Sequence, residues 1–295
     1  MSAMTTISEI HTTDLVQSCM RRVQLTHAGR AVKECTTALY LGLLFHEAAQ
    51  EWHKFPTIDM PERMRIAQSV LLARLKTENR PLTDAVARDL AEHAKTVREW
   101  LELYVERFEP MFRQCKIIGV ELPVRLTIEV DGVPQDFASH IDLLFRDENG
   151  MLRVWDFKTG EKSPTRAFID RNMQLGMYHL AILDGEVFHH GEWLSFGEAS
   201  IVEWVDVRRL EPLKKATSIT DARGKELPLE KGDLRPSNAV VFELMVNNPQ
   251  FIRDEFAIRT RMIRAGLFPT NPDPVGCHLC DCKYACPHWA QEEAQ

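Results

Sequence analysis

The sequence lacks the long apolar segments of membrane proteins and secreted precursors. None of its apolar runs reaches the roughly eighteen residues of a membrane-spanning helix, and its first residues contain no signal-peptide core. Internal repeats, low-complexity tracts and the G-x-x-x-x-G-K-[ST] motif of P-loop motors are missing as well. We therefore expect a cytoplasmic protein with no membrane association and no motor of its own.

The sequence has fewer basic than acidic residues. The chain has 36 Lys and Arg against 43 Asp and Glu, which gives a formal net charge of −7. This balance argues against a protein that coats nucleic acid by charge alone. It does not exclude an enzyme with a local basic groove, because carboxylates that bind cations also lower the net charge. The length of 295 residues allows a sizeable core.

The seven cysteines are an odd number, and four of them lie between Cys277 and Cys286. In a reducing compartment such clustering favours a metal site over a disulfide framework. The remaining three, Cys19, Cys35 and Cys115, are dispersed along the chain.

The pattern of apolar residues divides the chain into helical and β-rich parts. Apolar side chains at helical spacing predict helices over residues 30–52 and 82–108. After Cys115, short β-rich runs are separated by turn signals at Asp131-Gly132 and Asn149-Gly150. A helix over 165–184 and one or two strands follow. Residues 211–235 are polar without a period and predict a surface loop, and a last helix is expected over about 237–265.

These elements predict an α/β or α+β chain with a mixed central sheet flanked by helices. We expect a single domain over residues 1–295. Its parts are an N-terminal helical region (1–110), a core (115–210), a polar loop (211–235), and a C-terminal helix with a cysteine-rich metal-binding tail (236–295).

Asp156-Phe157-Lys158 is the central motif. Its carboxylate and ammonium lie two residues apart on a predicted strand and therefore share a face. Taken by itself, this motif could be an ordinary solvated ion pair on an exposed face of the sheet. Asp142 lies in the preceding strand, and a three-residue hairpin loop with left-handed Gly150 would put residue 142 opposite residue 156. A loop of two or four residues would separate them.

Two converging carboxylates suit a hard divalent cation such as Mg²⁺ or Mn²⁺. Such an ion polarises a phosphodiester and activates water, and Lys158 beside it would stabilise developing negative charge. The pattern therefore indicates phosphodiester hydrolysis.

Three further residues take part in a longer pattern, although each also has an ordinary structural interpretation. His46 lies on an amphipathic helix, where a partly buried histidine is common. Gln174 and Tyr178 are four apart on the helix after the Asp156 strand, so they are neighbours on one face and could simply cap the core.

Together these residues resemble the motif series of RecB-like PD-(D/E)xK nucleases. That family includes the nuclease domains of bacterial recombination helicase–nucleases and the CRISPR-associated and phage single-domain exonucleases. The series here is Gly42-x-x-x-His46, Glu121, Asp142, Asp156-x-Lys158 and Gln174-x-x-x-Tyr178. Glu121 lies on a strand that offers several candidates, and Ser139 replaces the usual glycine of a Gly-x-x-Asp signature.

The resemblance implies a restriction-endonuclease-like core and a DNA exonuclease that uses Mg²⁺ or Mn²⁺. It implies that His46, Asp142, Asp156 and the Phe157 carbonyl bind the metal. Lys158 would be the catalytic lysine, and Gln174 and Tyr178 would support the site or contact the strand.

The cysteine-rich tail admits two interpretations. One is a compact zinc knuckle that uses all four thiolates, or three with His278 or His288. The other resembles the iron–sulfur members of the same family, in which one N-terminal and three C-terminal cysteines hold a [4Fe-4S] cluster. The resemblance implies that Cys19, Cys277, Cys280 and Cys286 are these ligands and leaves Cys282 as a surplus thiol.

Several arginines and a lysine could track a nucleic acid backbone. They are Arg21, Arg22, Lys162, Arg166, Arg171, Arg259, Arg261 and Arg264. The expected partner is DNA, single-stranded or with free ends, together with a possible helicase or recombination protein. The same chemistry could act on RNA. The alternative from another class is a catalytically silent DNA-binding or assembly subunit, although such subunits usually lose the lysine or an acid.

Overall fold

A mixed β-sheet forms the centre of the molecule. The computed structural model describes residues 9–11, 14–15, 19–31, 34–160, 164–220, 226–244, 248–271, 277, 280, 282–287 and 289. Among these residues, eight strands join in the order β10-β7-β4-β3-β2-β5-β6, with β1 paired to β3. The strands are β1 (Glu9–His11), β2 (Lys116–Val130), β3 (Val133–Arg146), β4 (Leu152–Lys158), β5 (Glu186–His189), β6 (Glu192–Leu194), β7 (Ser200–Asp206) and β10 (Val241–Glu243). The pairs β4–β7 and β1–β3 are parallel and the others antiparallel.

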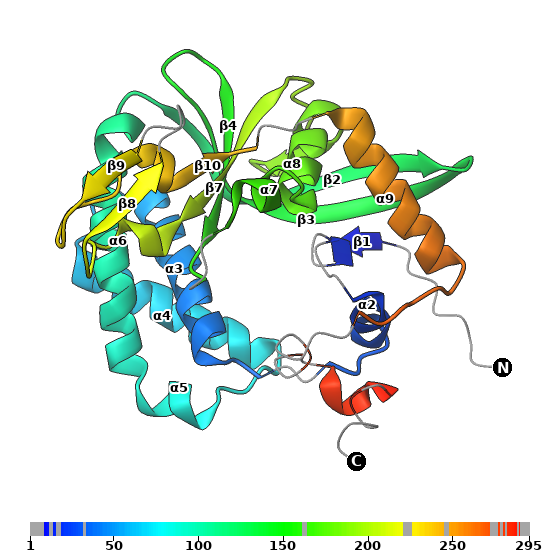
Figure 1. Ribbon diagram of the computed structural model, residues 1–295, viewed down its shortest axis with the longest axis horizontal. Coiled ribbons are helices and arrows are strands. Elements are labelled where there is room, and N and C mark those ends of the chain that lie inside the picture. Colours follow the sequence, from blue (N-terminus) through cyan, green and yellow to red (C-terminus); the bar gives the residue numbers. More distant parts are fainter. Residues whose placement is uncertain are drawn as a thin grey trace.

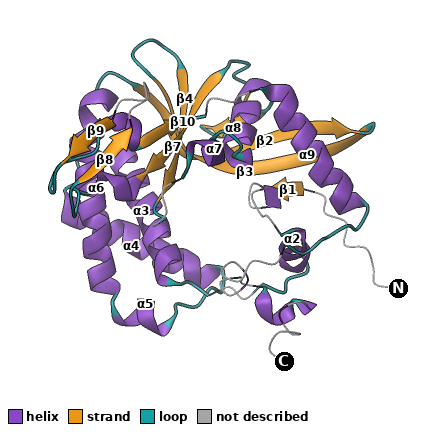
Figure 2. Ribbon diagram, viewed as in Figure 1, coloured by secondary structure: helices purple, strands orange, loops and turns teal. Residues whose placement is uncertain are grey.

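Helices flank this sheet, as the sequence predicts (Figure 2). They are α2 (Met20–His27), α3 (Thr37–Lys54), α4 (Met60–Thr77), α5 (Asp84–Arg88), α6 (Leu90–Phe112), α7 (Arg166–Ile169), α8 (Met173–Asp184) and α9 (Pro249–Arg264). Figure 1 shows α3, α4, α5 and α6 gathered together, while α8 and α9 lie beside the long β2–β3 hairpin.

Two apolar cores result, one on each side of β4. Trp155 and Phe157 belong to the core that α3 and α6 cover, and Val154 belongs to the core that α8 and α9 cover. Aromatic rings fill the first of these, with Phe108 of α6 lying 4.9 Å from Trp155 between ring centroids. The alternation along β4 therefore orients residues 155 and 157 toward α3 and α6, and residues 154 and 156 toward α8.

Local capping explains where several elements differ from the sequence prediction. Thr36 caps α3 by accepting from Leu39 N, so this helix begins at Thr37 and not near residue 30. The predicted helix over 165–184 is two helices, α7 and α8, because Thr165 and Asn172 each cap a helix. The helix predicted over 82–108 is also divided, into α5 and α6, although Asp89 at the division makes no side-chain capping bond.

The C-terminal part departs further from the prediction. The expected loop over 211–235 contains a hairpin of β8 (Thr217–Thr220) and β9 (Glu226–Leu229), and Leu213 ahead of it is buried. Helix α9 begins at Pro249, preceded by a 3-10 turn (Ser237–Ala239) and β10, and not near residue 237. Asn248 caps it and proline occupies the first turn, a combination that starts helices.

Within the described residues, no helix is both long and apolar enough to span a membrane.

Candidate active site

The β3–β4 hairpin brings Asp142 opposite Asp156. Its loop is the predicted three-residue form, closed by a backbone hydrogen bond, and Gly150 adopts a left-handed φ of +79°. The register pairs Leu143 with Trp155, so the next position along the ladder puts residue 142 across from residue 156. The predicted register is therefore confirmed.

Asp142 holds the two strands together where their ladder ends. Its Oδ2 accepts a hydrogen bond of 2.6 Å from Phe157 N, and its Oδ1 lies 3.5 Å from His46 Nδ1. Burial opposes ionisation of Asp142, but the positive charges of His46 and Lys158 and the Phe157 N–H keep its pKa below the ordinary value. Asp142 is thus a carboxylate at neutral pH.

Asp156 and Lys158 form an ion pair at the carboxyl end of β4. Lys158 Nζ lies 2.6 Å from Asp156 Oδ2, and Asp156 is 0% exposed. Its Oδ1 has no hydrogen-bond partner among the described residues. Burial raises the pKa of Asp156 to about 6; Lys158 opposes this rise and the charge of Asp142 adds to it. A buried carboxylate oxygen without a donor is a group that a bound cation would satisfy.

His46 and Glu121 complete the cluster from two other elements. His46 Nδ1 lies 3.3 Å from Glu121 Oε1, and its Nε2 lies 3.2 Å from the Phe157 carbonyl. Burial opposes protonation of His46, but the charges of Asp142 and Glu121 outweigh it and raise its pKa to about 10. Glu121 adopts a left-handed φ of +48°, which L side chains rarely do.

These groups could hold a divalent cation. Ligand atoms of His46, Glu121 and Asp142 all lie within 4.8 Å of one another. Two carboxylates, an imidazole and the nearby Phe157 carbonyl form a donor set suited to Mg²⁺ or Mn²⁺. Of the ligands predicted from the sequence, His46, Asp142 and Phe157 are brought together here, while Asp156 pairs with Lys158. Glu121 has a more central position than expected.

Gln174 and Tyr178 approach the same group of acids from α8. Gln174 Nε2 donates to the Tyr178 hydroxyl at 2.8 Å, and Tyr178 also bonds Ser139. Burial raises the pKa of Tyr178, and the charges of Asp156 and Asp142 raise it further, so its hydroxyl stays protonated. Ser139, the departure from the usual glycine, therefore helps to anchor this tyrosine.

A cavity of about 320 Å³ opens beside the cluster. His46, Glu121 and Lys158 line it, as does Arg74 of α4, whose guanidinium lies 2.7 Å from Glu47. Sequence patterns give no indication of Arg74, because α4 reaches the site only through tertiary packing.

Gly42 allows the close packing of α3 on the segment after β4. A Cβ atom at this position would lie 2.9 Å from Thr159 Oγ1, which is closer than real Cβ contacts. The glycine of the Gly42-x-x-x-His46 motif thus has a steric reason, one turn before the histidine.

Helix α2 and the C-terminal segment lie against each other at Cys282. Cys19 is the N-cap residue of α2, and Cys282 is fully buried against that helix, with its Sγ 3.5 Å from Thr26 Oγ1 and 3.9 Å from the Arg22 carbonyl. Figure 1 shows α2 beside the C-terminal segment. Cys277 and Cys280 are joined by a backbone hydrogen bond of 3.1 Å.

A four-cysteine zinc site requires closely spaced sulfurs. Four sulfurs around zinc lie about 3.8 Å apart, because each Zn–S bond is about 2.3 Å in a tetrahedral site. In the described part of the chain, no three cysteine sulfurs lie within 4.8 Å of one another. His278 and His288, the alternative zinc ligands, lie outside the described residues.

Comparison with known proteins gives one family. A model described as the PD-(D/E)XK nuclease superfamily matches residues 11–287. No curated protein matches the chain. A solved structure described as "Crystal structure of SSO0001" is 16% identical with a TM-score of 0.40, covering 96% of this chain and 87% of that one.

Proposed function

Because the chain belongs to the PD-(D/E)XK nuclease superfamily, we propose that it is a divalent-metal-dependent deoxyribonuclease with exonuclease activity. Its substrate is single-stranded DNA or a DNA end. One observation carries this proposal: Asp142, Asp156 and Lys158 converge from two neighbouring strands beside His46 and Glu121.

Each residue of the cluster has a distinct task in this proposal. His46, Glu121, Asp142 and the Phe157 carbonyl hold the cation, with Asp156 adding its buried oxygen. The bound cation supplies Lewis-acid stabilisation of charge on the phosphoryl oxygens. Lys158, paired with Asp156, presents a positive charge where the phosphodiester approaches. Tyr178, bonded to Gln174 and Ser139, lies beside the acids on the side of α8.

An intact set of charged groups favours an enzyme over a silent subunit. A DNA-binding scaffold has no need of a fully buried carboxylate whose oxygen lacks a donor among the described residues, because such a group costs stability. Asp142, Asp156 and Lys158 are all present and adjacent.

Degradation of end-labelled DNA tests the proposal. Single- and double-stranded oligonucleotides labelled at either end, and a matching RNA, are incubated with Mn²⁺ or Mg²⁺. We expect loss of DNA from one end by the wild type and a fall in rate of at least about 10²-fold in Lys158→Ala. Lys116→Ala is the matched control, since Lys116 lies at the opposite end of the sheet through its pairing with Arg146. Equal rates for Lys158→Ala and the wild type would refute the mechanism, and internal cuts would refute the exonuclease assignment.

We further propose that Cys19, Cys277, Cys280 and Cys286 hold a [4Fe-4S] cluster. Two observations support it: Cys282 packs its thiol on α2, and the four proposed ligands are half-buried. Four cysteine thiolates are the usual ligands of such a cluster. All seven cysteines are free of disulfides, so each thiol is available to bind a metal.

The visible spectrum of anaerobically purified protein tests the cluster. We expect a broad brown absorbance that disappears in Cys19→Ser and persists in the control Cys115→Ser, which alters a half-buried cysteine outside the proposed ligand set. A colourless wild-type protein that contains zinc would reject it. For the cellular role we propose recombination, repair or CRISPR-type processing, with strand separation supplied by a helicase partner.

A further inference from the structure

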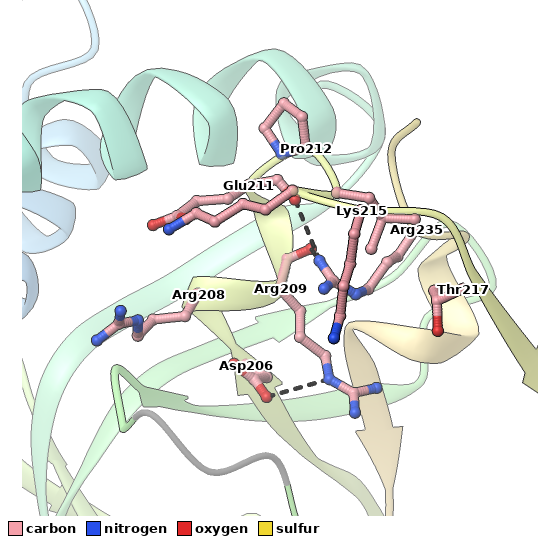
Figure 3. A pocket seen from close by; sticks show the side chains of 10 residues that line it. Asp206, Arg208, Arg209, Glu211, Pro212, Lys215, Thr217 and Arg235 are labelled. Carbon is pink, nitrogen blue, oxygen red and sulfur yellow. Dashed lines mark hydrogen bonds and ion pairs between the residues drawn. The ribbon is translucent and has the colours of Figure 1, made fainter. Parts of the chain in front are cut away.

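A second cavity, drawn in Figure 3, has a volume of about 300 Å³. It lies at the same end of β4 and β7 as Lys158 of the nuclease site. Its lining begins at Asp206, the last residue of β7. In the parallel pairing of β4 and β7, Asp206 stands directly beside Lys158. Neighbouring strands are about 4.8 Å apart, so the cavity begins one strand away from the proposed catalytic lysine.

The lining of this cavity is strongly cationic. Five basic side chains face two acidic ones, whereas the whole chain carries a net charge of −7. The basic residues are Arg208, Arg209, Lys214, Lys215 and Arg235. Both acids already have partners: Asp206 lies 3.5 Å from Arg209, and Glu211 accepts 2.6 Å from the Trp100 indole. Positive charge therefore predominates toward the opening.

Part of this cationic lining is held rigidly. Arg209 donates to the Ala239 carbonyl at 3.0 Å, and Arg235 donates to the carbonyls of Arg209 and Glu211 at 3.2 and 3.1 Å. Burial lowers the pKa of Arg209; the charge of Asp206 opposes this fall, and repulsion from Arg235 adds to it. Two arginines fixed side by side create a site that an anion would stabilise.

Lys215 completes the arrangement with an exposed amine. It is exposed and, within the described residues, has no ion pair or hydrogen bond. Figure 3 shows its amine directed toward the side chains of Arg209 and Arg235. The Thr217 hydroxyl at the start of β8 lies on the opposite wall.

Most basic residues that the sequence suggested for backbone binding have other contacts. Arg261 pairs with Asp131, and Arg264 donates to the Val130 carbonyl. Arg166 pairs with Asp170 on the same helix. Lys162 lies outside the described residues. The cavity that extends from Asp206 to Thr217 and Arg235 is thus a basic pocket one strand away from the catalytic strand.

We propose that this pocket binds a phosphate group of the nucleic acid whose scissile bond lies at the Asp142–Asp156 site. The proposal rests on the proposed nuclease function. It adds the path of the bound nucleic acid strand, which would run past the carboxyl ends of β4 and β7. Fixed arginines supply planar donors for phosphate oxygens, and Lys215 and Thr217 close over them. The phosphate is an internal phosphodiester or a terminal monoester.

Binding without cleavage tests this pocket separately from catalysis. Fluorescence anisotropy is measured with single-stranded DNA in EDTA for the wild type, Lys214→Gln/Lys215→Gln and the control Lys116→Gln. We expect the double variant to bind several-fold more weakly, with the slope of log K against log[salt] reduced by about 0.7 for each phosphate that the protein no longer neutralises. The control should match the wild type.

The oligonucleotides differ at their ends to identify the phosphate. A deficit restricted to 5′- or 3′-phosphorylated DNA assigns a terminal monoester, and an equal deficit for all assigns an internal phosphodiester. The proposal that this pocket binds phosphate is overturned if the double variant keeps its affinity and salt slope, or if the wild type does not bind DNA. If the pocket binds DNA but the wild type cleaves none, the nuclease proposal fails while phosphate binding by the pocket stands.

Discussion

At the scale of single residues, Glu121 combines backbone strain with a place in the acidic cluster. A left-handed non-glycine residue costs about 1–2 kcal/mol, and three carboxylates in one cluster repel each other. Such costs are tolerated at sites where a ligand later relieves them.

Metal binding should therefore stabilise the fold, and Glu121 should be needed for it. We expect Mn²⁺ at 100 times its dissociation constant to stabilise the wild type by about 2.7 kcal/mol, measured by thermal unfolding. Glu121→Gln should lose most of this gain, because a neutral amide binds the ion weakly. Glu129→Gln, an exposed residue of the same strand, should keep it. A full shift in Glu121→Gln would remove Glu121 from the ligand set.

Residues of the site differ in how far the sequence reveals them. Asp142 and Asp156 can be placed together from the sequence because strand alternation and one glycine determine the hairpin register. Arg74 cannot be found in this way, since its approach depends on how α4 packs against α3. Glu121 is hidden for a similar reason: its unusual φ breaks the alternation that would locate its side chain.

At the scale of elements, the distance between α3 and the segment after β4 depends on Gly42. Gly42→Ala should favour the helix but push Thr159 away, and with it the adjacent Lys158. We expect about a tenfold loss of nuclease rate with little change in unfolding temperature, because small displacements at an active site are costly. Gly42→Ala/Thr159→Ala removes the colliding atom and should recover the rate. A double variant as slow as the single one would contradict this steric account.

The contact between α3 and α6 should weaken in acid. His53 Nε2 lies 2.9 Å from the Tyr104 hydroxyl, and burial, with Arg63 adding, lowers the pKa of His53 to about 3. Between pH 6.5 and 3 the unfolded chain binds the extra proton, so stability falls as pH drops through that window and is constant above it.

Urea unfolding at a series of pH values checks this expectation. From pH 6.5 to 5 the wild type should lose up to about 2 kcal/mol more than His53→Gln, which keeps an acceptor but does not titrate. Identical pH profiles for the two proteins would show that His53 is not held neutral.

Strong local sequence patterns predicted some elements correctly, whereas weak patterns led to wrong assignments for others. The central strands and the sheet flanked by helices follow from alternation and turn residues. The hairpin of β8 and β9 was expected to be loop because its strands have only four residues each and lie in a mainly charged and polar stretch of sequence. The late start of α9 was missed although Asn248 and Pro249 form a recognisable helix start.

At the scale of the whole molecule, the buried Cys282 thiol joins the C-terminal segment to α2. Cys282→Ala should lower the free energy of unfolding by about 1 kcal/mol, since it removes a small buried group, and should leave the brown colour unchanged. Cys19→Ser should lower stability more, because a cluster bound only by the folded chain contributes to folding. Loss of colour in Cys282→Ala would instead make Cys282 a ligand.

The turn between β3 and β4 lies a full strand length, about 23 Å, from the cation group. Exposed turns usually tolerate changes in length. Here, however, the number of turn residues determines whether Asp142 and Asp156 lie on the same face of the sheet. Deleting Asn149 would leave an even-numbered turn, and a compensating one-residue slip would rotate one aspartate to the other side of the sheet. Such a variant should remain folded by circular dichroism but show no Mn²⁺-dependent stabilisation. At this distant tip, the parity of the residue count therefore matters more to the reaction than the identity of the exposed side chains.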